Sequence, residues 1–172
     1  MGNHALICPK LRSRFSRHNS CNRVIKEVFN SVEIPSTLEP IGLLRDDGKR
    51  PDGVTLLPWS RGRAVAWDFT CVHRLTASNE RYATEEGSTA ATEAEHRKRN
   101  HYSQLPSNII FEPVAVETLG GIGTSSFDFL RAIGYRIPTI RCEPRSFAFL
   151  RQRLSVALNV GNASCVLKSI SY

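Results

Sequence analysis

The sequence predicts an α/β fold built around a central β-hairpin, with helices before and after it. Two apolar runs, residues 54–59 and 64–72, are separated by the polar turn 60–63 (Ser-Arg-Gly-Arg), which is typical of an antiparallel hairpin. A third apolar run, residues 109–116, has the length of a buried strand. Segments with apolar residues at helical spacing flank these runs, so the predicted order is helix, strand, hairpin, helix, strand, helix, helix.

The first helix is expected to begin at a cap formed by Asn19 or Ser20 and to end before Pro35. Its apolar face would comprise Cys21, Val24, Ile25, Val28 and Phe29. A short extended segment at residues 37–39 follows this helix. The Asp-Asp-Gly triplet in the charged loop 45–50 then indicates a turn before the hairpin.

The segment after the hairpin predicts a loop and a second helix. Residues 73–87 are polar and indicate a long loop. The helix begins at Ser88 or Thr89 and continues to about Leu105. It is rich in Ala, Glu, Lys and Arg, which favour a helical backbone.

A strand and two helices complete the predicted fold. The strand at 109–116 ends at a turn with three glycines, and a helix follows at 125–133. The last helix comes after Pro144. Its apolar residues at helical spacing are Leu150, Leu154, Ala157 and Leu158.

The length of 172 residues fits one ordinary domain, predicted at residues 21–172, preceded by a basic arm at residues 1–20. The chain holds 23 Lys and Arg against 16 Asp and Glu, a formal net charge of +7 that favours a polyanionic partner. No acidic residue precedes Glu27. The candidate phosphate contacts of the arm are Lys10, Arg12, Arg14 and Arg17. The alternative is a basic terminus that is only solvated.

The cysteines and the hydropathy pattern bear on the compartment. Five cysteines, an odd number without a tight spacing pattern, favour a reducing environment. No apolar stretch approaches the roughly 20 residues that span a bilayer, and no secretory signal is visible. The sequence therefore predicts an intracellular protein, nuclear or cytoplasmic, that is neither secreted nor inserted in a membrane.

Two acidic residues occupy neighbouring positions of the predicted hairpin. Asp52 precedes the first strand, and Asp68 lies within the second, where an aspartate is poorly suited unless it has a partner. Carboxylate oxygens are the ligands that Mg²⁺ takes while it keeps several waters. The pair therefore predicts a magnesium site. The alternatives are a turn residue before Gly53 and an acid at a strand edge.

Three motifs occur in order along the chain: Pro51-Asp52, then Asp68, and then residues 98–102 with the sequence Lys-Arg-Asn-His-Tyr. In this order they resemble the restriction-like PD-(D/E)XK endonuclease domain of reverse-transcriptase-related, non-LTR retrotransposon polyproteins. That family has a PD pair, a second Asp a dozen or more residues on, and a Lys-rich motif that ends in Lys-Tyr. The resemblance covers roughly residues 4–167 and includes residues 116–120 (Val-Glu-Thr-Leu-Gly).

The resemblance implies a restriction-endonuclease-like core of helix, mixed sheet with a central hairpin, helix and strand, with extra C-terminal helices. It also implies Mg²⁺-dependent nicking of target DNA, with Asp52 and Asp68 as metal ligands. Lys98 and Tyr102 would complete the catalytic set, and His101 would contact the nucleic acid. The free 3′ hydroxyl would prime synthesis by a reverse transcriptase domain in a parent polyprotein.

The chain departs from the family pattern at two positions. Thr70 stands where the classical motif has a lysine, two residues after the second acid. The resemblance implies that Lys98, on the following helix, supplies the cation instead. His101 stands where the family has the lysine of its Lys-Tyr ending. Without the family pattern, Lys98 would be interpreted as part of a solvated helix face.

His4 and Cys8 have the spacing of metal ligands and resemble the second half of the zinc knuckle that precedes this nuclease domain. The first half is absent, whereas a structural zinc site takes four ligands. Three interpretations stay open. The pair is a partial Zn²⁺ site that is complete only in a longer parent chain, a site completed by His18 and a remote residue, or two residues without a metal role.

Two other functions fit the same sequence. The first is a catalytically silent nucleic-acid-binding remnant of the same fold, and the second is a nuclease of this fold in repair or restriction. The two aspartates would distinguish an active site from a silent fold. Ligands of one metal ion must converge to within about 4 Å, whereas a silent fold can turn one carboxylate into solvent or into a salt bridge.

Overall fold

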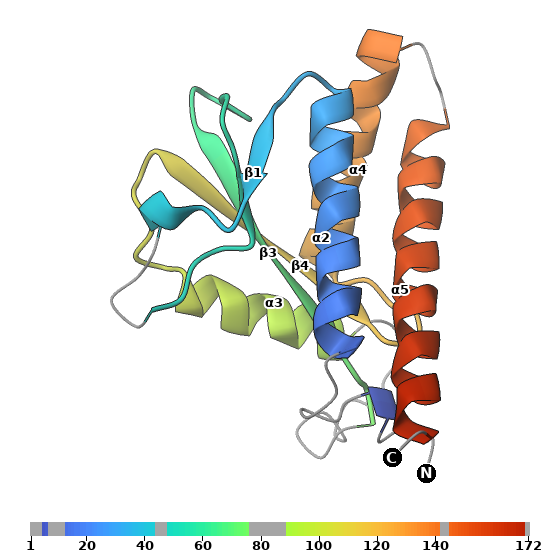
Figure 1. Ribbon diagram of the computed structural model, residues 1–172. Coiled ribbons are helices and arrows are strands. Elements are labelled where there is room, and N and C mark those ends of the chain that lie inside the picture. The colour runs from blue at the N-terminus through green and yellow to red at the C-terminus, as the bar shows by residue number, and fades with distance from the viewer. Residues whose placement is uncertain (1–4, 7–12, 44–47, 76–88, 142–144, 171–172) are drawn as a thin grey trace.

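The computed structural model describes residues 5–6, 13–43, 48–75, 89–141 and 145–170. It is an α/β fold, and its elements follow the predicted order (Figure 1). In chain order they are α2 (Ser13–Ser31), β1 (Ser36–Leu38), the 3₁₀ helix η1 (Ile41–Leu43), β2 (Gly53–Thr55), β3 (Ala64–Val72), α3 (Thr89–His101), β4 (Ile109–Glu117), α4 (Thr124–Arg141) and α5 (Ser146–Ile170).

The four strands form one mixed sheet in the order β1-β2-β3-β4. The pairs β1–β2 and β2–β3 are antiparallel, which confirms the predicted hairpin. Its first strand ends at Thr55, shorter than the predicted run 54–59, and Pro58 in that run has no N–H for a ladder. β3 and β4 pair in parallel along their full length, and α3 makes the crossover that parallel strands need.

The two faces of the sheet carry different cores (Figure 1). On one face α2 and α4 cover the strands and α5 packs against both helices, around side chains that include Trp67, Phe69 and Phe29. On the other face α3 packs through Ala91 and Ala94. Alternate residues of β3 therefore point to opposite cores, as the period of two in a strand requires.

Helix α2 begins at Ser13, so the expectation of an irregular arm up to residue 20, with a cap at Asn19 or Ser20, is wrong for residues 13–20. The physical reason is packing against α5. A Cβ at Gly161 would lie 2.5 Å from the Cβ of Arg17, so the missing side chain lets the two helices approach closely. The expected boundary at residue 20 falls inside this helix.

Two other helices end at different residues from those expected. α3 stops at His101 instead of near Leu105, and α4 continues to Arg141 instead of ending near residue 133. The extension passes Gly134, where a Cβ would lie 2.8 Å from the Cα of Phe147 in α5. Most of the expected loop 73–87 lies outside the described residues. Within the described part of the chain, no helix has the length and apolar content to cross a bilayer.

Candidate active site

The open edge of β3 is where the candidate site lies. β2 pairs with β3 only through Gly53 opposite Trp67 and Val54 opposite Ala66. The same antiparallel register, continued by one residue, brings Asp52 beside Asp68 on the face opposite Trp67. Beyond this point β3 pairs with β4 alone among the described strands, so side chains from both faces can meet at its free edge.

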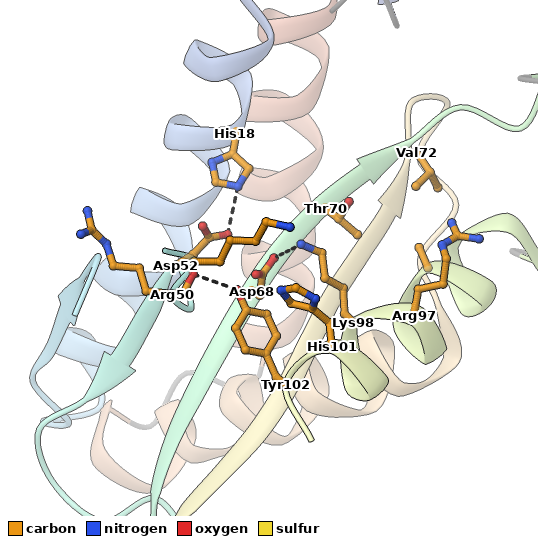
Figure 2. A pocket seen from close by; sticks show the side chains of 12 residues that line it. His18, Arg50, Asp52, Asp68, Thr70, Val72, Arg97, Lys98, His101 and Tyr102 are labelled. Atoms are coloured by element: carbon orange, nitrogen blue, oxygen red, sulfur yellow. Dashed lines mark hydrogen bonds and ion pairs between the residues drawn. The ribbon is translucent and has the colours of Figure 1, made fainter. Parts of the chain in front are cut away.

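The two predicted acids line one cleft of about 490 Å³ at this edge (Figure 2). Its walls come from α2, from the loop before β2, from β3 and from α3. The lining side chains are His18, Lys49, Arg50, Asp52, Asp68, Thr70, Val72, Ala94, Arg97, Lys98, His101 and Tyr102. All four predicted catalytic residues are therefore in the same cleft, as is the predicted nucleic-acid contact His101. Thr70 also lines it, at the position where the classical motif has a lysine.

Asp68 is buried, with 4% of its surface exposed, and it forms an ion pair with Lys98. The Lys98 Nζ atom lies 2.7 Å from Asp68 Oδ1. Burial and the nearby charge of Asp52 raise the pKa of Asp68, while Lys98 and Tyr102 act in the opposite direction. The net upward direction shows that the carboxylate is only partly compensated, which is the electrostatic condition that favours an added cation.

Asp52 binds the edge of β3 where β2 no longer pairs with it. Its Oδ2 atom accepts the backbone N–H of Phe69 at 2.7 Å, a donor that a longer β2 would have bound. The same oxygen lies 2.9 Å from Nε2 of His18. Burial alone would lower the pKa of His18, but the hydrogen bond and charge of Asp52, with Asn19 and Asp68, raise it above its ordinary value.

The end of α3 supplies the third side of the cleft. Tyr102 directly follows α3, its backbone N–H donates to the Lys98 carbonyl at 3.0 Å, and the two side chains reach the cleft together. The Tyr102 hydroxyl donates to the Arg50 carbonyl at 2.8 Å, and its ring packs on Phe111. Tyr102 thus anchors the loop that carries Asp52. His101 packs edge-on against the Tyr102 ring.

The structure describes only two of the predicted arm residues, Arg14 and Arg17, and places them differently. Arg17 is buried, and its guanidinium donates to Asn162 Oδ1 at 2.7 Å and to the Leu6 carbonyl. It therefore packs between α2 and α5, and with 3% of its surface exposed it has little area to offer a phosphate. Arg14 lines a second hollow of about 430 Å³ that shares His18, Thr70 and Lys98 with the first. The other predicted arm residues lie outside the described residues: His4, Cys8, Lys10 and Arg12.

Several residues of the cleft were not predicted from the sequence as site residues. Lys49, Arg50 and Arg97 bring positive charge to the walls, and His18 was considered only as a zinc ligand. A signal for His18 exists in the sequence. It lies three, four and seven residues before Cys21, Asn22 and Ile25, on the buried face of α2 once that helix is extended towards the N-terminus.

The donor set fits a hard divalent cation better than zinc. The described residues contain no cluster of three or more His, Cys, Asp or Glu side chains arranged to hold a metal. Two carboxylates with room for water and phosphate oxygens suit Mg²⁺, which keeps most of its own waters, whereas a structural zinc site closes with four protein ligands. Comparison with known proteins found no family model and no curated sequence that matches the chain.

Proposed function

We propose that the chain is a Mg²⁺-dependent DNA endonuclease with a restriction-endonuclease-like core, which nicks target DNA for the integration of a non-LTR retrotransposon. One observation carries the proposal. Asp52, Asp68 and Lys98 come from three separate segments and meet in a cleft with further cations on its walls. In this proposal a reverse transcriptase domain, joined to the nuclease in a parent polyprotein, extends the nick.

The arrangement of elements supports the restriction-like core. α2 precedes the sheet, the β2–β3 hairpin brings both acids to its edge, and α3 connects β3 to the parallel strand β4. α4 and α5 then correspond to the additional C-terminal helices. The lysine that the classical motif has on the strand is replaced by Lys98, whose ammonium reaches the same carboxylate from α3.

The residues of the cleft match the demands of phosphodiester hydrolysis. A bound Mg²⁺ would polarise the scissile phosphate and lower the pKa of the attacking water. The new bond joins the water oxygen to phosphorus, and the P–O3′ bond breaks. The attacking water releases a proton to solvent and the leaving O3′ takes one up, which leaves a 5′ phosphate and a 3′ hydroxyl. Lys98 would offset the charge that develops on the phosphate oxygens. Lys49, Arg50 and Arg97 would contact flanking phosphates.

A catalytically silent nucleic-acid-binding domain is the second candidate. Two observations favour it: each carboxylate already contacts a basic side chain of the same chain, and position 101 holds a histidine where the resembled family has a lysine. This candidate keeps the basic cleft and its affinity for DNA but carries out no hydrolysis. Whether the chain hydrolyses the DNA backbone therefore distinguishes the two candidate functions.

The proposed function is tested by detecting the free 3′ hydroxyl ends that nicking creates in DNA. Supercoiled plasmid is incubated with the full chain and Mg²⁺, and a DNA polymerase with labelled nucleotides then reports nicks that carry a free 3′ hydroxyl. Labelled, nicked circles are expected from the wild type and from Asp128→Ala, which removes an exposed carboxylate of α4. Asp52→Ala should give none while it still retains DNA on a filter. Filter retention by the wild type without nicking would favour the silent domain.

A further inference from the structure

A chain of hydrogen bonds leads from the core to the proposed metal site, and its first member is Trp67. This indole is fully buried, and its Nε1–H donates to Asn22 Oδ1 at 3.0 Å. An indole nitrogen can only donate, so the atom that faces it must be an acceptor. The side-chain amide of Asn22, itself buried, is therefore held with its oxygen towards Trp67 and its NH₂ group directed elsewhere.

The NH₂ group of Asn22 determines the tautomer of His18, which lies one helical turn earlier in α2. The Nδ2 atom of Asn22 lies 3.3 Å from Nδ1 of His18. An amide NH₂ only donates, so Nδ1 accepts, and the proton of the neutral imidazole is on Nε2. Asn19 Oδ1 could accept only from a protonated Nδ1, but its distance from Nδ1 is longer, 3.5 Å, and this contact is exposed, so the Asn22 contact decides the tautomer.

The protonated Nε2 of His18 faces Asp52. Its N–H donates to Asp52 Oδ2 over 2.9 Å, and the backbone N–H of Phe69 donates to the same oxygen over 2.7 Å. Both bonds use Oδ2, so Oδ1 is the oxygen that Asp52 can offer to a cation. Figure 2 shows His18 reaching Asp52 from α2 while Lys98 reaches Asp68 from α3.

We propose that His18 is a positioning residue. The chain from Trp67 through Asn22 fixes its imidazole as the Nε2–H tautomer, and this N–H orients the Asp52 carboxylate for a divalent cation shared with Asp68. The part about the cation rests on the proposed function, whereas the tautomer does not. Neighbours that orient a ligand in this way typically change metal affinity by roughly 10- to 100-fold when they are removed.

The tautomer is tested by NMR. Two-bond ¹H–¹⁵N correlation spectra of the ¹⁵N-histidine-labelled chain, recorded at alkaline pH where imidazoles are neutral, distinguish the two forms. We expect His18 to be the Nε2–H form in the wild type, and a mixture of both forms in Asn22→Leu. A wild-type His18 in the Nδ1–H form would overturn the proposal, and so would a spectrum that Asn22→Leu leaves unchanged.

The effect on the cation is tested by electron paramagnetic resonance titration with Mn²⁺, which takes the same oxygen ligands as Mg²⁺. His18→Leu should weaken Mn²⁺ binding about tenfold or more. His18→Gln should recover most of the affinity, because a glutamine NH₂ can donate from near the position of Nε2. The matched control is His96→Leu, an exposed histidine of α3 outside the cleft, which should bind Mn²⁺ like the wild type.

The outcomes separate this inference from the proposed function. Mn²⁺ affinities in the order wild type, Gln, Leu support positioning by His18 even if the chain nicks no DNA. Nicking by the wild type together with unchanged Mn²⁺ affinity in His18→Leu would overturn the positioning role alone. A His18→Gln variant that binds Mn²⁺ no better than His18→Leu would also overturn it. A wild type that binds no Mn²⁺ would contradict both proposals.

Discussion

The ammonium of Lys98 lies 2.7 Å from the carboxylate of Asp68, although the two residues are on different elements and 30 positions apart. The contact joins the last turn of α3 to the middle of β3. In the classical motif the lysine would occupy the position of Thr70, on the same strand face as the acid. Here the side chain from α3 brings a cation to the same carboxylate.

This contact predicts which cation of the motif is essential. Lys98→Ala should abolish nicking, because it removes the ammonium beside Asp68. His101→Lys should raise the rate only slightly, since Lys98 already supplies an ammonium to Asp68, whereas His101 packs against the Tyr102 ring. Nicking rates on supercoiled plasmid measure both effects. Lys168→Ala, in the last turn of α5, is the matched control and should keep the wild-type rate.

An inactive wild type that His101→Lys restores would contradict this assignment. It would move the essential cation to position 101 and identify the natural chain as a nuclease that has lost activity at one position. A neutral imidazole carries no charge, so it cannot replace the ammonium of a lysine.

The charged carboxylate of Asp68 is predicted to lower the stability of the fold, although the proposed metal site needs it. Burial and the charge of Asp52 raise its pKa, so the folded chain binds this proton more tightly than the unfolded chain does. The stability contributed by this proton is present below the ordinary pKa of Asp and is lost as the pH rises through the raised value. Asp68→Asn imitates the neutral form. Without Mg²⁺, it should therefore unfold at a higher temperature than the wild type at neutral pH, and the difference should shrink in acid.

Calorimetry at several pH values, in EDTA, measures this effect. Asp128→Asn is the control, because that carboxylate is exposed on α4 and should show no comparable gain. A lower unfolding temperature for Asp68→Asn at neutral pH would show that the pair with Lys98 stabilises the fold more than burial of the charge destabilises it.

Two cysteines are predicted to resist alkylation. Burial raises the pKa of Cys21 to about 12 and that of Cys71 to about 11, and only the thiolate reacts. At pH 8 both should label at least about a hundredfold more slowly in the folded chain than an ordinary cysteine of pKa about 8.5. A pulse of iodoacetamide followed by peptide mass spectrometry measures the rates, with the urea-unfolded chain as reference. Equal rates in the two states would contradict the burial of Cys21 and the partial burial of Cys71.

The basic walls of the cleft are predicted to control the salt dependence of DNA binding. Each phosphate contact that is lost should flatten the plot of log affinity against log salt by roughly one unit. Arg97→Ala should do so, whereas Arg131→Ala, on α4 and outside the cleft, should not. Arg17→Ala should lower the unfolding temperature and leave the slope unchanged, because Arg17 is bonded inside the fold. A flatter slope for Arg17→Ala would identify Arg17 as a phosphate contact.

The pairing of the two acids follows from local sequence patterns alone, whereas the position of His18 also depends on tertiary packing. The hairpin of two apolar runs places Asp52 beside Asp68 through local pairing alone, so a strand prediction suffices. His18 depends on where α2 begins, and that start is set by tertiary packing on α5 at Gly161, which no local pattern shows. The burial of Arg17 also depends on tertiary packing, because its partners Asn162 and Leu6 lie 145 and 11 positions away in the sequence.

The most direct test of the central claim is the rate of plasmid nicking by the purified chain in Mg²⁺ and in EDTA, for the wild type and Asp68→Asn. We predict nicking by the wild type in Mg²⁺, none in EDTA, and none by Asp68→Asn under either condition although that variant remains folded. Nicking that continues in EDTA, or a wild-type rate from Asp68→Asn, would contradict the account. So would a folded, DNA-binding wild type that leaves the plasmid intact in Mg²⁺.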